Sequence, residues 1–276
     1  MSLQTTNTEI LSARQMIGTH DVLLITLDTL RYDVALRCWQ EGRTPFLNSL
    51  LPASGWEPRH TPGSFTFAAH QAFFAGFLPT PIPPGPHPRL FAAAFAGSET
   101  TTERTAVFDA PDIVTGFRDR GYRTVCVGGV GFFNPATPLG RVLPGLFDEC
   151  YWSKELGVTD PNSTANQVGV ALDSLSQIPS SSRVFLFVNV SALHQPNRFY
   201  VDGATHDSPE TQAAALAYVD GQLPPLFEAL QKRGPVLCVI CSDHGTAYGE
   251  DGYIGHRLAH PVVWTVPYAE FVLPAI

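Results

Sequence analysis

The sequence predicts an α/β protein, a three-layer α/β/α sandwich around a mostly parallel central sheet. Short apolar runs without polar alternation, as found in strands that are buried on both faces, occur at 21–27, 123–128, 183–190 and 236–241. Segments of helical character separate these runs. Such alternation is typical of βαβ units, whose helices cover both faces of a parallel sheet.

The remaining elements follow in chain order. We expect helices at 31–40, 44–51, 66–76, 110–120 and 165–176, and one long helix at 209–232. The segment from Pro79 to Pro88 predicts a stiff surface loop, because its prolines and glycine lack a backbone donor or a side chain. Since predicted strands lie on both sides of this loop and must share one sheet, we expect a single domain over 1–276.

Composition excludes several classes of partner. The formal charge of -8 and the absence of any run of lysine or arginine argue against nucleic acid and anionic lipid. The sequence has no stretch of 18 apolar residues and no apolar signal-peptide segment near its start, so we expect no membrane association and a cytoplasmic location. Five cysteines, an odd number, predict reduced thiols. The oligomeric state is left open.

Two acidic residues stand just beyond apolar runs at opposite ends of the chain. Asp28 follows the first run, and Asp243-His244-Gly245 follows the last. Ligands of parallel sheets gather beyond the carboxyl ends of the strands. Carboxylates with an imidazole favour zinc or manganese, while magnesium and calcium stay open, and Gly245 would let the chain turn around the ion. The alternative is a plain turn in which the aspartate caps an amide.

Thr66 stands at the start of the predicted apolar helix 66–76. The amides of a first helical turn attract an anion, and coordination to a divalent ion would lower the pKa of the hydroxyl. We therefore predict Thr66 as both nucleophile and metal ligand, with a helix cap as the alternative and Ser64 in reserve. His70, one turn further on, would bind substrate or orient the hydroxyl, unless it is a core histidine. Arg31 is expected to pair with Asp33 or a buried carboxylate.

Several motifs, in this order, resemble sulfatase-like members of the alkaline phosphatase superfamily. They are VLLITLDTLRYD at 22–33, TPFLNSL at 44–50, the segment 65–79, HQP at 194–196, SDHG at 242–245 and GH at 255–256. The resemblance implies an α/β sandwich in which Asp28, Asp243 and His244 bind a divalent metal and Thr66 is the nucleophile. It also implies that His194 and His256 are catalytic and contact the transferred group or the leaving group.

The chain also departs from the family. True sulfatases carry C-x-P-S-R or S-x-P-S-R, whose first residue becomes formylglycine, whereas this chain has Thr66-Phe-Ala-Ala-His70. Threonine cannot form that aldehyde, so the motif looks more like the phosphotransfer branches, which include membrane-anchored phosphoethanolamine-type and glycerophosphate-type transferases. Thr29 replaces a second aspartate, and 189–194 contains none. We therefore expect one strong metal site, with a second, weaker one open at His194 and His256.

The function that these features predict is metal-dependent hydrolysis or transfer of a phosphate ester through a threonine nucleophile. The ester could be a phosphomonoester, a phosphodiester or a phosphonate, and the substrate a small molecule or a protein-borne anionic group. Two alternatives remain, a sulfatase with an unmodified hydroxyl and a catalytically silent metal-binding accessory protein. The chain is short for the family and would lack the usual C-terminal subdomain that closes the pocket. We therefore expect an open cleft.

Overall fold

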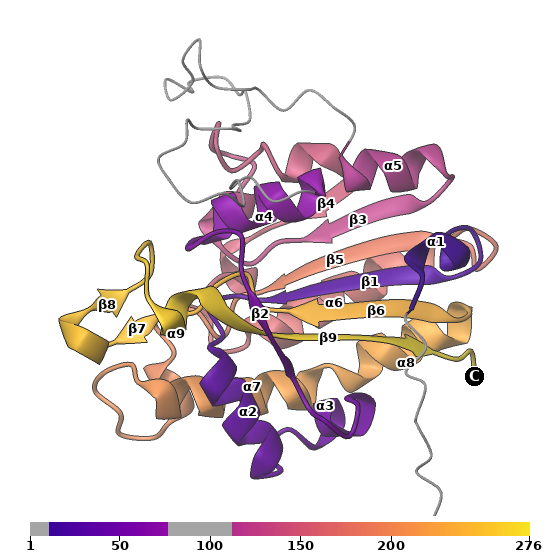
Figure 1. The fold of residues 1–276 in the computed structure, drawn as a ribbon. Coiled ribbons are helices and arrows are strands. Elements are labelled where there is room, and N and C mark those ends of the chain that lie inside the picture. The colour runs from indigo at the N-terminus through magenta and orange to yellow at the C-terminus, as the bar shows by residue number, and fades with distance from the viewer. Residues whose placement is uncertain (1–10, 77–111) are drawn as a thin grey trace, which may run out of the picture.

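The computed structural model describes residues 11–76 and 112–276, which surround a seven-stranded sheet of order β2-β9-β6-β1-β5-β3-β4 (Figure 1). The strands are β1 (Asp21–Leu27), β2 (Glu57–His60), β3 (Arg123–Val127), β4 (Glu149–Tyr151), β5 (Val184–Val190), β6 (Val236–Cys241) and β9 (Thr265–Leu273). Strands β6, β1, β5, β3 and β4 pair in parallel, and β9 runs antiparallel to both β6 and β2. The predicted mostly parallel sheet is confirmed.

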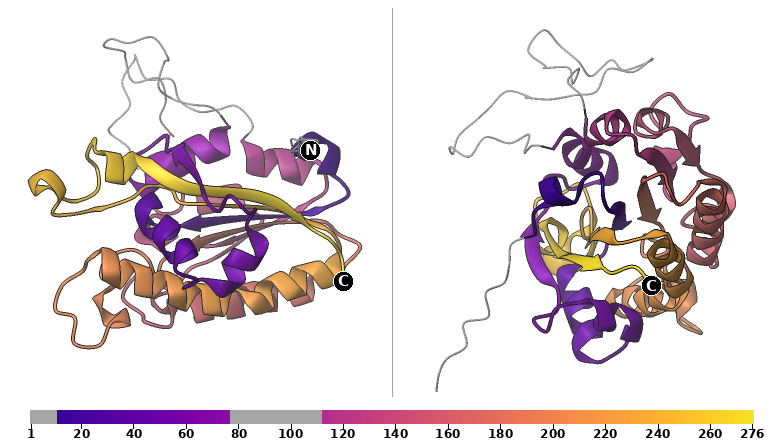
Figure 2. Two further views of the ribbon diagram at one scale, coloured as in Figure 1. Left: turned by 60° about the horizontal axis from the view of Figure 1, so that its bottom comes forward. Right: turned by 90° about the vertical axis from the view of Figure 1, so that its right-hand side faces the viewer.

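Helices cover both faces of this sheet, as Figures 1 and 2 show. One layer consists of α2 (Tyr32–Gln40), α3 (Pro45–Leu50), α6 (Ser163–Gln177), α7 (Pro209–Gln222) and α8 (Pro224–Arg233). The opposite layer contains α4 (Thr66–Ala75) and α5 (Ile113–Asp119), with the short α1 (Ala13–Met16) at its margin. In the sequence between β6 and β9, the chain forms a small hairpin of β7 (Ala247–Tyr248) and β8 (Ile254–Gly255), followed by α9 (Pro261–Trp264). The predicted three-layer sandwich is confirmed.

The apolar runs are explained by burial on both sides of the sheet. In β1, Leu23 and Ile25 belong to the core beneath the α2/α7 layer, whereas Val22 and Leu24 belong to the core beneath α4 and α5. Successive side chains of a strand point to opposite faces, so a strand with a core on each side is apolar along most of its length. Its neighbour β5 is buried at all seven of its residues for the same reason.

The structure differs from the predicted elements at one helix and at several strands. The expected long helix at 209–232 is two helices, because Pro224 and Pro225 remove backbone donors and their rings obstruct the preceding turn. Strands β2, β4, β7, β8 and β9 were not predicted. All four residues of β2 are exposed, so it carries no apolar signal, and β9 contains Pro267, which argues against a strand. The predicted loop at 79–88 lies outside the described residues.

None of the helices within 11–76 and 112–276 has the length and apolar character needed to cross a lipid bilayer. All five cysteines are free thiols, and Cys238 and Cys241 are buried in β6. The single-domain assignment over 1–276 stays a prediction.

Candidate active site

The first and last parallel strands of the chain bring three candidate ligands together. Because β1 and β6 are adjacent and parallel, Asp28 and Asp243 emerge at the same edge of the sheet. Asp28, Asp243 and His244 are completely buried, and one ligand atom from each lies within 4.8 Å of the others. The structure thus places all three residues as the motif analysis expected.

Each carboxylate has one oxygen held by the protein and one without a partner. Asp243 Oδ1 accepts hydrogen bonds from the backbone amides of Thr29, at 3.2 Å, and His244, at 3.0 Å. Asp28 Oδ2 accepts from the Asn189 amide Nδ2 at 3.0 Å. The other two oxygens, Asp28 Oδ1 and Asp243 Oδ2, are buried and find no hydrogen-bond partner in the part of the chain that the structure describes. Buried charged atoms normally have partners, and a cation would supply one for both.

His244 is oriented for the same role. Its Nδ1 donates a hydrogen bond to the Gly245 carbonyl oxygen at 2.8 Å, so Nε2 is the free acceptor and faces Asp243 Oδ2 at 3.6 Å. Such a bond to the far nitrogen fixes the tautomer of a metal-binding histidine. Two carboxylate oxygens and one imidazole nitrogen, all buried, fit a divalent metal ion.

The protonation of the three ligands follows from their burial. Burial raises the pKa of Asp28 to about 6, helped by the neighbouring charge of Asp243, and burial raises the pKa of Asp243 to about 7. Burial also lowers the pKa of His244 below its ordinary value. Two carboxylates in a dry site resist ionisation together, and a bound cation reverses that preference.

Gly245 is needed for a reason other than the expected turn. A Cβ atom at this position would collide with the backbone carbonyl of Val262, and the Gly245 amide donates to the Val263 carbonyl at 2.7 Å. Any side chain would therefore push α9 away from the metal ligands. The glycine permits close approach of two backbones rather than an unusual backbone angle.

Thr66 is the first residue of α4 rather than its cap, because the N-cap position is occupied by Phe65. The Thr66 side chain is buried, and its Oγ1 lies 3.4 Å from both Asp28 Oδ2 and His244 Nε2. These separations are long for strong hydrogen bonds, so the hydroxyl lies against the ligands without being tied to either. Nearby, the Thr61 hydroxyl donates to the Asp243 carbonyl oxygen and anchors the segment that leads into α4.

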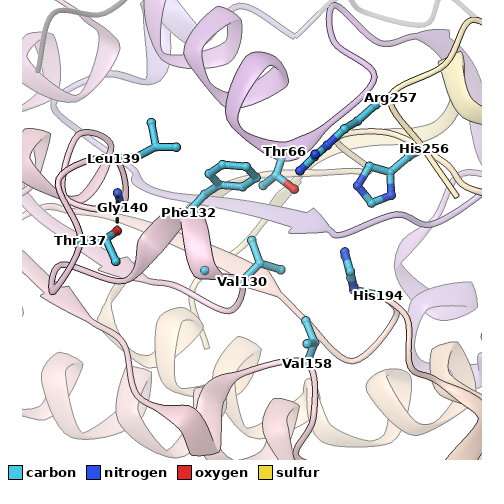
Figure 3. Close-up of a pocket in the computed structure, with 11 residues that line it drawn as sticks. Thr66, Val130, Phe132, Thr137, Leu139, Gly140, Val158, His194, His256 and Arg257 are labelled. Atoms are coloured by element: carbon cyan, nitrogen blue, oxygen red, sulfur yellow. Dashed lines mark hydrogen bonds between the residues drawn. The ribbon is translucent and has the colours of Figure 1, made fainter. Parts of the chain in front are cut away.

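A cleft of about 310 Å³ opens beside Thr66 (Figure 3). One end of it is polar and is formed by Thr66, His194, His256 and Arg257. The other end is apolar and includes Phe132 and Leu139, while Val130 and Val158 line the cleft between the two ends. The ring centroid of His256 lies 5.5 Å from that of His194 and 4.6 Å from that of His244. The structure therefore brings His194 and His256 to the threonine, as the resemblance implied.

Arg257 was missed in the sequence, where it simply follows the Gly-His pair. Its φ angle is 68°, in the left-handed region that non-glycine residues rarely adopt. The Arg257 amide donates to the Ser64 carbonyl at 2.8 Å, and its guanidinium lies 5.6 Å from the Phe65 ring centroid. Strained residues of this kind cost about 1–3 kcal/mol and gather at functional sites. The strained backbone here places the positively charged Arg257 side chain in the cleft beside Thr66.

His70 does not support the predicted contact with substrate. Its side chain is completely buried, Nδ1 donates to the Thr66 carbonyl at 2.7 Å, and Nε2 accepts from the Thr26 hydroxyl at 3.0 Å. Both ring nitrogens are therefore engaged inside the protein. Burial lowers the pKa of His70 to about 3, so the ring is neutral. The geometry corresponds to the core histidine that was the alternative, here fastening the first turn of α4 to β1.

Arg31 pairs internally, as expected. It forms ion pairs with Asp33, at 2.6 Å, and with Glu250, which lies between β7 and β8. Arg31 directly follows the Asp28 loop, and the β7/β8 hairpin leads into His256 and Arg257. This ion pair thus fastens the polar end of the cleft to the carboxyl end of β1.

Comparison with known proteins identifies the fold. No protein-family model matches the sequence, and no curated protein matches it either. The soluble domain of lipooligosaccharide phosphoethanolamine transferase A from Neisseria meningitidis superposes with a TM-score of 0.61 at 16% identity, over 92% of this chain and 77% of that one. The C-terminal periplasmic domain of EptC from Escherichia coli, in complex with Zn, gives 0.60 at 14% identity, over 94% and 74%. Lipoteichoic acid synthase LtaP from Listeria monocytogenes gives 0.59 at 13% identity, over 91% and 65%.

The cytoplasmic location predicted from the sequence is contradicted by these structures. The EptC domains from Campylobacter jejuni and Escherichia coli, which share this fold, are periplasmic domains. The prediction was wrong because it inferred the cellular compartment from the lack of an apolar segment. Neither the charge nor the core of a folded domain indicates on which side of a membrane it lies. The chain therefore shares the fold of these transferase domains, which is the mostly parallel α/β sandwich that its motifs predict.

Proposed function

We propose that this protein is a metal-dependent hydrolase or transferase of phosphate esters that uses Thr66 as its nucleophile. The observation that carries the proposal is the position of Thr66 Oγ1, 3.4 Å from both Asp28 Oδ2 and His244 Nε2 at the end of an open cleft. The neighbours named as phosphoethanolamine transferases favour phosphorus over sulfur as the reacting centre and a location outside the cytoplasm.

Asp28, Asp243 and His244 would hold one divalent ion, and the EptC domain solved with Zn favours zinc. When bound, the ion would lower the pKa of the Thr66 hydroxyl and neutralise charge on a phosphoryl oxygen. Asn189 holds one oxygen of Asp28 in place, and the Thr29 amide does the same for Asp243. Charge stabilisation of this kind supplies most of the acceleration in phosphoryl transfer.

The reaction then proceeds through residues of the cleft. Thr66 Oγ1 gives its proton to water and forms a bond to phosphorus, while the bond from phosphorus to the departing alcohol oxygen breaks. His194 protonates that oxygen from Nε2, because its Nδ1 donates to the Gln195 carbonyl at 2.5 Å and leaves Nε2 for the cleft. Water or an acceptor alcohol next attacks the phosphothreonine and gives its proton to His194 Nε2. The bond from phosphorus to Thr66 Oγ1 breaks, and that oxygen regains a proton from water.

His256 and Arg257 bind the phosphoryl oxygens. Burial lowers the pKa of His256 to about 3, so its neutral ring contributes an N–H donor and does not compete with His194 as the acid. Arg257 supplies the local positive charge that an anionic substrate needs, since the whole chain carries a formal charge of -8.

The test is an assay of p-nitrophenyl phosphate, phosphodiester, phosphonate and sulfate esters with zinc, manganese or a chelator, comparing wild type with Thr66→Ala. We expect turnover of a phosphorus ester that the chelator and the variant both abolish. Undiminished turnover in Thr66→Ala would show that Thr66 is not the nucleophile. Hydrolysis of the sulfate ester alone would favour the sulfatase alternative, and metal retention without turnover of any ester would favour the silent accessory protein.

A further inference from the structure

We infer that the cleft accepts an ester whose organic group is uncharged, compact and apolar, such as a benzyl group, and that it disfavours an ethanolammonium group. The inference rests on the proposed function for the position of the phosphoryl group beside Thr66. It concerns the opposite, apolar end of the same cleft, to which the proposed mechanism gives no role.

The apolar wall begins directly beside the nucleophile. The Phe132 ring centroid lies 6.2 Å from that of Phe65 and 5.7 Å from that of Phe67, the two residues that flank Thr66. Leu139 continues the wall beyond Phe132, on the side away from His256 (Figure 3). A phosphoryl group held at Thr66 therefore places its ester substituent against Phe132. Burying apolar area there favours an apolar substituent.

Charge in the cleft works against a cationic substituent. A buried ammonium group needs a carboxylate or a cage of aromatic rings. None of the described residues that line the cleft is acidic, Phe132 is its only phenyl ring, and Arg257 would repel a second cation. The nearby carboxylates are committed elsewhere, because Asp28 and Asp243 face the metal position and Glu250 pairs with Arg31.

The cleft also offers little to a substituent with many hydroxyl groups. Thr137 is the one hydroxyl among the described residues at its apolar end, and that oxygen already accepts from the Gly140 amide at 3.0 Å and donates to the Asn134 carbonyl at 3.4 Å. At about 310 Å³ the cleft is at the small end of ligand sites. One phosphoryl group and one ring-sized group would fill it.

The test compares the affinities of benzylphosphonate and 2-aminoethylphosphonate for the full zinc-loaded chain by calorimetry. Both compounds keep a carbon–phosphorus bond that the proposed reaction does not break, so the measurement does not depend on turnover. We expect benzylphosphonate to bind about tenfold more tightly or better. Phe132→Ala should reduce this preference at least threefold, and Leu139→Glu should shift it towards the ammonium compound. Leu146→Ala, in the same segment but outside the cleft lining, is the matched control.

Equal affinities, tighter binding of 2-aminoethylphosphonate, or no binding of either phosphonate would overturn the inference. The wild-type comparison decides this even where Leu139→Glu fails to fold. The two proposals fail separately. Preferential binding of benzylphosphonate without turnover of any ester contradicts the proposed function and keeps the inference, whereas ester turnover with equal phosphonate affinities does the reverse.

Discussion

Asn189 donates a hydrogen bond from Nδ2 to Asp28 Oδ2 at 3.0 Å, and its Oδ1 accepts from the Val130 amide at 3.1 Å. One buried side chain thereby joins a candidate metal ligand to the wall of the cleft. Because Asn189 occupies one oxygen of Asp28, the carboxylate presents its other oxygen towards Asp243 and His244. The segment 189–194 thus contains no aspartate, but its first residue, Asn189, orients the candidate metal ligand Asp28.

Replacing Asn189 should weaken metal binding more than it weakens the fold. Asn189→Ala releases Asp28 Oδ2, and the loss of a residue that orients a metal ligand typically costs about 10- to 100-fold in affinity. Competition with a chelating dye measures the change. Asn166→Ala is the control, because among the described residues that side-chain amide donates to the Glu155 carbonyl alone. An unchanged affinity in Asn189→Ala would show that Asp28 needs no support or binds no metal.

The metal-free protein should show a pH dependence that comes from the two buried aspartates. Their folded-state pKa values of about 6 and about 7 lie above the ordinary value, so the native state holds protons that the unfolded chain has released. Their contribution to stability is therefore complete below about pH 4 and is lost as the pH rises towards 7. Neutral buried histidines such as His70 act in the opposite direction.

Denaturant unfolding in chelator at several pH values isolates this contribution. The free energy of unfolding of wild type, minus that of the double variant Asp28→Asn with Asp243→Asn, should decrease between about pH 4 and about pH 7. A difference that is constant or increases over that interval contradicts the raised pKa values.

Zinc binding should follow the opposite pH course. The ion requires both carboxylates ionised, so apparent affinity should rise as the pH increases through the range in which Asp28 and Asp243 lose their protons. At a free zinc concentration of about 100 times Kd, binding should stabilise the fold by about 2.7 kcal/mol. Thermal unfolding with and without zinc at pH 5 and pH 8 measures both effects. A shift in Tm that is equal at the two pH values would exclude these aspartates as the ligands.

Variants of Thr66 should show whether its hydroxyl is the nucleophile or whether the residue only maintains the shape of the site. Thr66→Ser keeps the hydroxyl and should retain much of the activity, whereas Thr66→Val keeps the shape and should lower kcat/KM by roughly a thousandfold or more. Both variants should still bind zinc, because Asp28, Asp243 and His244 are unchanged. The assay combines ester kinetics with metal content. Activity of Thr66→Val close to that of Thr66→Ser would assign the chemistry to another group, with Ser64 the first to be tested.

The ion pair of Arg31 with Glu250 should affect both stability and substrate binding. The Arg31 side chain is 5% exposed, and Glu250→Gln removes one of its two charged partners, which should cost about 1–3 kcal/mol. Because the hairpin carries His256 and Arg257, we also expect KM to rise. Glu228→Gln is the control, since its pair with Lys232 lies on the surface and should not change the unfolding midpoint. Unchanged KM in a destabilised Glu250→Gln would limit the pair to a structural role.

The sequence predicted those parts of the fold and site that depend on burial. The runs that became β1, β5 and β6 are apolar because both faces of the sheet are covered, and that pattern also located Asp28 and Asp243 at one edge. Thr66 followed from its place at the start of an apolar helix, and the resemblance to a known family supplied His194 and His256. Strand β2 could not be found, since it is held by backbone pairing to β9 and has no buried side chain.

Residues whose role depends on three-dimensional surroundings were harder to predict. Arg257 shows its importance only through a left-handed backbone and a contact with the Ser64 carbonyl. His70 was predicted to lie on the same face of its helix as Thr66. Its partner Thr26, however, lies on strand β1, and the contact with Thr26 directs the His70 ring into the core. A pattern read along one helix cannot show which side chain of a neighbouring strand will satisfy it.

The most direct test of the account is a crystal structure of the zinc-loaded protein with anomalous diffraction recorded at the zinc edge. We predict one strong peak bounded by Asp28 Oδ1, Asp243 Oδ2 and His244 Nε2, beside the Thr66 hydroxyl. Full zinc occupancy at another position, or a zinc-saturated crystal with no peak among these atoms, would contradict the proposed metal centre and with it the activation of Thr66.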